Sequence, residues 1–186
     1  AVTFHRIVAL LLYISKRARP DLAPAVPFLT TRVTKPSEDD WRKLRNVIEY
    51  LRDTKDLPLI LQVDKTKPDV WSVDAAYAVY ADCKSHTGGS FTMGHGSFLS
   101  ISCKQKTNCK GSCEAELVTV DDFIGSVLRV RHFLLAQGYK PAQTVIILQD
   151  NRSAILLEQN GIMSSTNRTK HINVRYYFVM SRIDAG

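Results

Sequence analysis

The stretch Thr144–Ile155, with the sequence TVIILQDNRSAI, decides the fold of this chain of 186 residues. Its first part, Thr144–Gln149, is a continuous apolar run, which is typical of a β-strand buried on both faces of a sheet. Asp150 and Asn151 then supply cap residues for a helix that we expect to run from Ser153 to Gln159. A buried strand followed directly by a helix is the unit from which α/β domains are built.

The segments on either side of this stretch predict a mixed sheet. Strand-like patterns bounded by glycine-containing turns occur at Val70–Tyr80, Gly89–Met93 and Ser97–Cys103. A long amphipathic helix from Glu114 to about Gln137 follows them, and a last basic helix is expected from about Arg168 to Arg182. Three hairpin-like strands, a helix, a strand and a helix form an α/β order.

The first third of the chain has the pattern of helices only. Apolar residues recur at helical spacing between Phe4 and Ile14, and Pro20 can begin a second helix that continues to Leu29. Ser37 and Asp40 have the spacing of a capping box, and an apolar stripe runs from Trp41 to Leu51 behind them.

A change of composition near residue 67 marks the expected boundary between two parts. Pro58–Val63 is a short strand candidate, and a polar linker follows it. Residues 1–67 carry 13 basic and 8 acidic side chains, a net charge of +5, whereas residues 68–186 carry 12 and 10, a net charge of +2. We therefore expect a basic helical module over residues 1–67 and an α/β domain over residues 68–186. The basic excess suits a polyanionic partner.

The composition excludes several classes of protein. Apolar residues make up 45% of the chain and charged residues 23%, which excludes wholesale disorder and a disulfide-dense miniprotein. The longest unbroken apolar run, Ile7–Ile14, has eight residues. A bilayer span needs about 20 such residues, so we expect no membrane as a partner.

Three acidic residues occupy positions where an acid is unusual. Asp74 interrupts the strand that begins at Val70, Glu116 lies in the first turn of the long helix, and Asp150 ends the quoted strand. If the first and fourth strands lie side by side, Asp74 and Asp150 converge, and Glu116 reaches them from the covering helix. Three carboxylates without His or Cys suit two Mg²⁺ ions, or Mn²⁺, and such ions support phosphodiester cleavage.

An ordinary structural role is available for each of these acids, and spacing alone favours it. Asp150 could cap the helix that follows it, and Glu116 could complement the helix dipole from the first turn. Asp74 could be a polar side chain that faces the edge of the sheet.

The order of the motifs resembles that of a copia-type retrotransposon polyprotein. The first third resembles the end of the reverse transcriptase, where a helix and the R-P-D step of Arg19–Asp21 precede a helix with Trp41 and Tyr50–Lys55. The remainder resembles the ribonuclease H domain that follows in those polyproteins, on six motifs in the family's order. These motifs are Val73–Ala75, His86–Gly89, Lys104–Lys106, Glu114–Leu117, Gln149–Ile155 and Arg168–Ile172.

The resemblance implies a ribonuclease H-like fold, with a mixed sheet of three antiparallel strands and then a parallel strand, flanked by helices. It implies hydrolysis of the RNA strand of RNA–DNA hybrids during reverse transcription, with two Mg²⁺ ions, or Mn²⁺, as cofactors. Asp74 would bridge both ions, and Glu116 and Asp150 would each hold one. The rest of the reverse transcriptase polyprotein is the implied partner, and the implied location is intracellular, in a cytoplasmic particle or the nucleus.

Two features of the sequence bear on this implied activity. The family's fourth carboxylate lies in an A-D-x-x-T-K block, and the chain stops at Gly186 before any such block. We therefore expect a truncated domain without its last strand and helix, and the alternative function is a non-catalytic nucleic-acid-binding or scaffolding remnant. The residues expected to contact nucleic acid are Lys104, Lys106, Asn151, Arg168 and Lys170.

Overall fold

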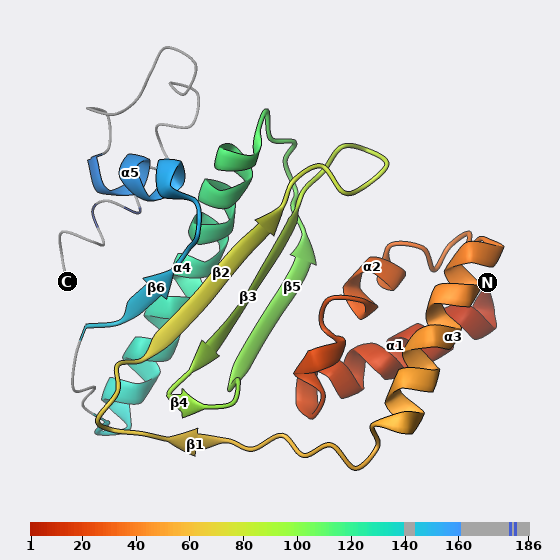
Figure 1. Cartoon of the computed structure of the whole chain (residues 1–186), viewed down its shortest axis with the longest axis horizontal. Helices are drawn as coiled ribbons and strands as arrows, with labels where there is room; N and C mark the ends of the chain where they lie inside the picture. Colours follow the sequence, from red (N-terminus) through yellow and green to blue (C-terminus); the bar gives the residue numbers. More distant parts are fainter. Residues whose placement is uncertain (140–143, 161–178, 180, 182–186) are drawn as a thin grey trace.

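The computed structural model describes residues 1–139 and 144–160, together with residues 179 and 181. Over these ranges a set of helices precedes a mixed sheet, and further helices flank that sheet (Figure 1). The α/β fold class expected from the sequence is therefore confirmed. The expected last helix, Arg168–Arg182, falls almost wholly outside the described residues.

The first third of the chain forms helices α1 (Val2–Arg17), α2 (Val26–Thr30) and α3 (Glu38–Asp53), with a 3₁₀ turn, η1 (Pro20–Leu22), before α2. We call these elements the helical module. The single helix expected from Pro20 to Leu29 is wrong. Pro24 has no N–H with which to bond the carbonyl of Pro20, so the first helical turn cannot continue. The helical module has one apolar core, whose buried members are Phe4, Val8, Leu11, Leu22, Val26, Leu29, Leu44 and Val47.

The ends of α3 are held by polar contacts. The expected capping box is confirmed, because the Asp40 N–H donates to Ser37 Oγ (3.2 Å) and the Ser37 N–H donates to Asp40 Oδ2 (2.8 Å). At the other end, the buried Arg19 guanidinium donates to the Thr54 carbonyl (2.9 Å) and to Asp21 Oδ2 (2.7 Å). The hydrogen bond from Arg19 lowers the pKa of Asp21. The R-P-D step is thus a clamp between η1 and the end of α3.

The sheet contains strands β2 (Val70–Ala76), β3 (His86–Thr92), β5 (Leu99–Lys104) and β6 (Ile146–Leu148), in the order β5-β3-β2-β6. β2 pairs with β3 and β3 with β5 in antiparallel fashion, and β6 pairs with β2 in parallel. This is the expected ribonuclease H-like arrangement of three antiparallel strands followed by a parallel one.

Several strand limits differ from the expectation. The first strand ends at Ala76, because the chain turns through Ala78, whose φ is +51°, and Tyr80 N–H bonds the Lys84 carbonyl (3.2 Å). Of the apolar run before the linker, only β1 (Gln62–Val63) is a strand, and it pairs with β4 (Gly94–His95). Residues 57–61 before it are exposed.

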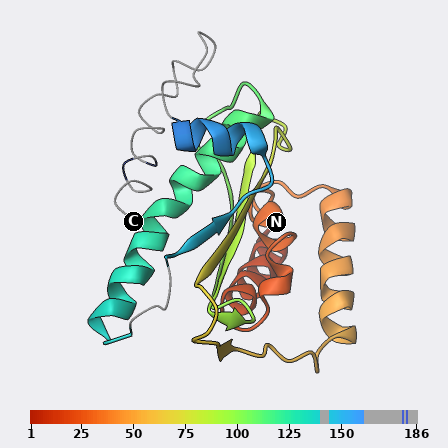
Figure 2. The same cartoon turned by 60° about the vertical axis from the view of Figure 1, so that its left-hand side comes forward.

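Helix α4 (Ser112–Ala136) crosses one face of β2 and β3, and α5 (Arg152–Asn160) packs against α4 (Figures 1 and 2). The main core lies beneath α4, where Trp71 contacts the rings of Phe91 and Phe123. Burial of β6 on both faces, as expected from its apolar run, is wrong: β6 ends the described sheet, and Leu148 is 53% exposed. None of the helices in the described ranges combines the length and apolar character needed to cross a bilayer.

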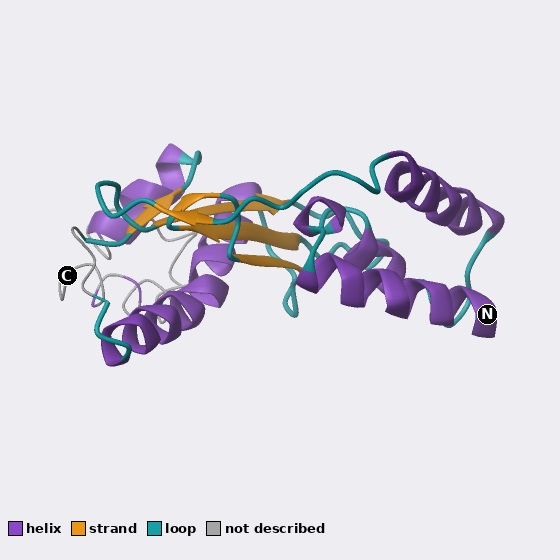
Figure 3. Ribbon diagram, turned by 90° about the horizontal axis from the view of Figure 1, so that it is seen from below, coloured by secondary structure: helices purple, strands orange, loops and turns teal. Residues whose placement is uncertain are grey.

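The helical module contacts the sheet along β5, beyond the strands that α4 covers (Figure 3). Ser102 Oγ donates to the Ala23 carbonyl (2.6 Å) and lies 2.7 Å from His86 Nε2, while His86 Nδ1 lies 2.7 Å from Tyr80 Oη. Because the Ser102 proton is used on Ala23, Ser102 accepts from His86 Nε2–H, and Nδ1 accepts from Tyr80. Burial lowers the pKa of His86, which favours this neutral tautomer.

The two glycines at the centre of β3 should differ in how well they tolerate a methyl group. A Cβ at Gly89 would lie 2.6 Å from Phe123 Cζ and 2.6 Å from the Ser72 carbonyl oxygen, whereas a Cβ at Gly88 meets only the Asp74 carbonyl oxygen, at 3.7 Å. We expect Gly89→Ala to lower the free energy of unfolding by about 1–3 kcal/mol, and Gly88→Ala to change it by less than about 0.5 kcal/mol. Urea unfolding of both variants measures this, and equal losses would contradict the packing described.

Candidate metal centre

The parallel pairing of β2 and β6 places two of the acids at equivalent positions. Ser72 pairs with Leu148, so Asp74 and Asp150 each lie two residues further along adjacent strands. Side chains alternate between the faces of a sheet, and this register therefore directs both acids to the same face. The expectation that these strands lie side by side is confirmed.

Glu116 reaches the same point from the second turn of α4. It is 5% exposed, and each of its carboxylate oxygens accepts one hydrogen bond: Oε1 from the Ala75 N–H (3.4 Å) and Oε2 from Gln149 Nε2 (3.5 Å). One oxygen from each of Asp74, Glu116 and Asp150 lies within 4.8 Å of the other two. The three acids selected from the sequence are thus brought together, although only Glu116 is buried.

The ordinary structural roles considered for these acids are filled by other residues. Asn151 Oδ1 accepts from the Ala154 N–H (3.1 Å), so Asn151 and not Asp150 caps α5. The acid in the first turn of α4 is Glu114, which accepts from the Lys110 N–H (2.7 Å). Asp74 lies on β2, which is an inner strand of the sheet and not an edge strand.

The electrostatics of this cluster suit a cation. Burial, and secondly the negative charge of Asp74, raise the pKa of Glu116, and the bonds from Gln149 and Ala75 oppose this only in part. Among the described residues, no ion pair involves any of the three carboxylates. Oxygen donors of this kind are the ligands that Mg²⁺ and Mn²⁺ prefer, so the residues present fit these ions.

Two residues that sequence reasoning missed lie behind Glu116. Gln149 and Glu158 line a cavity of about 710 Å³ between α4, β6 and α5. The Oε1 atom of each is buried and has no hydrogen-bond partner among the described residues, and burial together with Glu116 raises the pKa of Glu158 to about 7. The sequence does contain a signal for Glu158: it lies four residues after Ala154, and this spacing places an acid on the apolar face of α5.

A groove of about 510 Å³ lies beside Asp74, between the helical module and the face of the sheet that α4 does not cover. The side chains of this sheet face are small and polar near the acid. In register across β2, β3 and β5 they are Ser72, Ser90 and Ser100 in one row, and Asp74, Gly88 and Ser102 in the next. Pro20, Pro24 and Phe28 form the wall from the helical module.

None of the described residues that were expected to contact nucleic acid lines this groove. Lys104, at the end of β5, pairs with Asp82 (2.7 Å) and lies over the ring of Tyr80. Lys106 is exposed, and Asn151 uses its side chain to cap α5. Arg168 and Lys170 lie outside the described residues.

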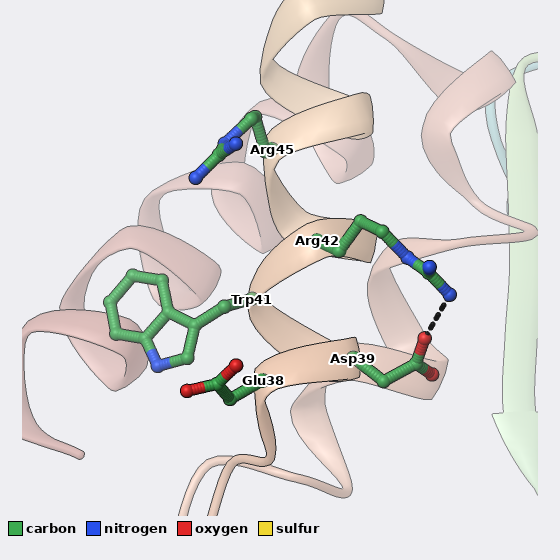
Figure 4. Close-up of a pocket in the computed structure, with 5 residues that line it drawn as sticks. All are labelled: Glu38, Asp39, Trp41, Arg42 and Arg45. Carbon is green, nitrogen blue, oxygen red and sulfur yellow. Dashed lines mark hydrogen bonds and ion pairs between the residues drawn. The ribbon is translucent and has the colours of Figure 1, made fainter.

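A further hollow, of about 550 Å³, lies on the surface of α3 and is remote in sequence from the acids. Glu38, Trp41 and Arg45 project from one side of the helix, while Arg42 turns toward Asp39, with which it forms an ion pair (Figure 4). All the lining residues come from a single helix and converge on no common point, so we assign no site there.

The mixed sheet, its flanking helices and the carboxylate cluster define the class of this protein as a ribonuclease H-like α/β protein with a candidate metal centre. Over 184 residues, 98% of the chain, it is 30% identical to the retrovirus-related Pol polyprotein from transposon RE2 of Arabidopsis thaliana. It is 28% identical, over 98% of the chain, to that from transposon TNT 1-94 of Nicotiana tabacum, and 28% identical, over 91%, to the transposon Ty1-NL2 Gag-Pol polyprotein of Saccharomyces cerevisiae.

The homologues of this chain are therefore Pol polyproteins of copia-type (Ty1/copia) retrotransposons, as the motif order predicted. The chain spans 12%, 14% and 10% of the length of the three relatives named. No family model matches it, and no solved structure matches it.

Glu158 should make the stability of the protein depend on pH. Its pKa is about 7 in the folded chain and near the ordinary 4.5 in the unfolded chain. Between these values the unfolded chain ionises first, so the free energy of unfolding falls as the pH rises and then levels off above pH 7. This shift corresponds to about 3 kcal/mol.

We therefore expect Glu158→Gln, which cannot ionise, to gain stability relative to the natural chain as the pH rises, with the gain approaching about 3 kcal/mol at pH 8 compared with pH 4. Urea unfolding at several pH values measures the difference. Glu49→Gln, on the exposed surface of α3, controls for the loss of one carboxylate. A constant difference between Glu158→Gln and the natural chain would contradict the expectation.

Proposed function

We propose that this chain is the ribonuclease H region of a retrotransposon Pol polyprotein and that it hydrolyses the RNA strand of RNA–DNA hybrids during reverse transcription. The observation that carries the proposal is the convergence of Asp74, Glu116 and Asp150, within 4.8 Å, on a ribonuclease H-like sheet. The homology to Pol polyproteins supports a role in a retroelement.

Each acid has a distinct part in this proposal. Asp74, on the inner strand β2, would contact two Mg²⁺ or Mn²⁺ ions, and Glu116 and Asp150 would hold one each. When bound, such ions neutralise phosphate charge and activate water. Glu116 is buried and hydrogen-bonded and supplies a fixed ligand, whereas Asp74 and Asp150 are exposed on the sheet face where a phosphate can approach.

The groove beside Asp74 is the proposed path of the RNA strand. Ser90 in the groove, and Ser72 paired with it on β2, present hydroxyl groups that have no hydrogen-bond partner within the described part of the chain, and Gly88 leaves the space next to Asp74 open. Such groups suit the 2′-hydroxyls and backbone of RNA, which hybrid-binding proteins recognise in preference to base edges. Lys104 and Lys106 at the end of β5 would contact phosphates.

The same proposal divides the chain at residue 67 and places it within the reverse transcriptase polyprotein. The helical module has its own apolar core, between Phe4 and Val47, and the core beneath α4 is formed from Trp71 onward. Residues 1–67 would be the connection of the reverse transcriptase and would help to hold the duplex through their basic side chains. The reaction would take place inside the cell, in a particle or in the nucleus.

The proposal predicts that Asp74→Asn, which removes a charge but little volume, abolishes cleavage. A labelled RNA–DNA hybrid is incubated with Mg²⁺ or Mn²⁺ and the protein, both as this chain and within the longer polyprotein. We expect a loss of at least about 100-fold in rate, without a fall in the melting temperature, because Asp74→Asn removes a negative charge that opposes ionisation of Glu116. Asp56→Asn, an exposed acid in the linker, is the matched control. Hybrid binding without cleavage by any natural form would favour the non-catalytic alternative.

A second prediction concerns the groove. Gly88→Val places a branched side chain beside Asp74, with a Cβ at an ordinary contact distance of 3.7 Å from the Asp74 carbonyl oxygen, and we expect it to weaken hybrid binding about tenfold, equivalent to 1.4 kcal/mol. Gly125→Val, on the exposed face of α4 with no atom within 4 Å of its Cβ, is the matched control. Fluorescence anisotropy without a divalent cation separates binding from cleavage, and equal affinities of the two variants would exclude the groove as the path.

A further inference from the structure

We propose that Gln149 and Glu158 form a buried pair that positions the Glu116 carboxylate, with Glu158 donating to Gln149 so that the amide NH₂ faces Glu116. This inference rests on the proposed function, because there Glu116 is the buried ligand of the metal centre. Gln149 and Glu158 are positioning residues and touch neither substrate nor ion.

The orientation of Glu116 depends on one adjustable donor. Its Oε1 atom is held by the Ala75 N–H, which belongs to the backbone of β2 and cannot turn. Its Oε2 atom is held by the side-chain amide of Gln149. A primary amide has a donor end and an acceptor end, and a half turn of Gln149 would set its oxygen against the Glu116 carboxylate. Something must therefore fix which end of the amide faces Glu116.

The Oε1 atoms of Gln149 and Glu158 can together fix the orientation of the Gln149 amide. With its NH₂ toward Glu116, Gln149 has a buried Oε1 to which no described residue donates, and Glu158 lines the same cavity with a buried Oε1 that likewise has no partner in the described part of the chain. Both atoms are acceptors while Glu158 is ionised. A single proton on Glu158 turns it into a donor, and one hydrogen bond then satisfies Gln149 and Glu158 together.

The surroundings of Glu158 favour that proton. Glu158 is 8% exposed, and its pKa is raised first by burial and then by the negative charge of Glu116. The ionisable groups that face this region come from α4: Glu116 and Cys113 near the acid, and Arg131 and His132 on the cavity wall. Among the described residues, neither Arg131 nor His132 forms an ion pair with Glu158.

The test replaces each member of the pair by a side chain of similar shape. Glu158→Met and Gln149→Met remove the hydrogen bonds, whereas Glu158→Gln keeps a donor for the Gln149 oxygen. The affinity of the full chain for Mn²⁺, measured by calorimetry without substrate, should fall about tenfold in each Met variant, the usual effect of losing an outer partner of a metal ligand. Glu158→Gln should bind Mn²⁺ as the natural chain does, and Gln137→Met, at an exposed position just after α4 and outside the cavity, is the matched control.

Two readouts distinguish positioning from packing. The double variant Gln149→Met with Glu158→Met should bind Mn²⁺ no more weakly than either single variant, because the pair acts as a unit. In the metal-free protein, the side-chain NH₂ signals of Gln149 in a ¹H–¹⁵N spectrum should exchange slowly with water, and should lose this protection in Glu158→Met but not in Glu158→Gln.

The outcomes separate this inference from the proposed function. Unchanged Mn²⁺ affinity in both Met variants, additive losses, or a Gln149 amide that is unprotected in the natural chain would overturn the positioning pair while leaving the nuclease proposal standing. Coupled losses of Mn²⁺ affinity in a protein that never cuts hybrid would support the pair and reject the nuclease. If Glu158→Met does not fold, Gln149→Met and the amide spectrum of the natural chain still decide.

Discussion

The parallel pairing of β2 with β6 is the interaction on which the rest of the site depends. It joins segments that are 76 residues apart, since Val70 pairs with Ile146 and Ser72 with Leu148. A slip of one residue in either strand would turn Asp74 or Asp150 to the opposite face of the sheet. The three pairs of residues that form this ladder therefore carry the convergence of the acids. The core of Trp71, Phe91 and Phe123 beneath α4 supports the ladder, because it fixes which face of β2 is buried.

The three acids are held unequally, and this asymmetry has a chemical meaning. Glu116 is buried and receives hydrogen bonds from the backbone of β2 and from Gln149, whereas Asp74 and Asp150 are exposed. A buried carboxylate close to another acid is costly unless a cation or a proton compensates it. The protein donors around Glu116 reduce that cost without removing it, as the raised pKa of Glu116 indicates.

The three acids of this site could be selected from local patterns in the sequence, although spacing alone favoured an ordinary structural role for each and the order of the motifs decided between the two interpretations. Acids at the interruption of one strand, the end of another and the start of a helix can be recognised residue by residue, and Asp74, Glu116 and Asp150 do converge. Other features depend on what the chain packs against. The apolar run of β6 does not show whether the strand is central or lies at the edge of the sheet. In the structure β6 ends the described sheet, and Leu148 is exposed. The end of the first helical turn at Pro24 could have been predicted from the sequence, because the missing N–H of proline is a local property.

The environment of Gln149 and Glu158 could not have been predicted from the sequence. Whether a buried oxygen lacks a hydrogen-bond donor depends on the cavity that tertiary packing creates around it. The same holds for the choice of cap. Asp150 and Asn151 are equally good cap residues by composition, and the position at which α5 begins decides that Asn151 takes the role and leaves Asp150 free.

A series of hydrogen bonds runs from Tyr80 through His86 and Ser102 to the Ala23 carbonyl. It holds the helical module against the sheet at a place far from the segment that connects the two parts covalently. The covalent link between the helical module and the sheet includes residues 57–61, whose side chains are exposed. The relative placement of the two parts is held at β5, where this series of donors and the hydrogen bond from Lys16 Nζ to the Ser100 carbonyl cross between them. Insertion or scission in the covalent link should therefore disturb the relative placement of the two parts less than a substitution of Ser102.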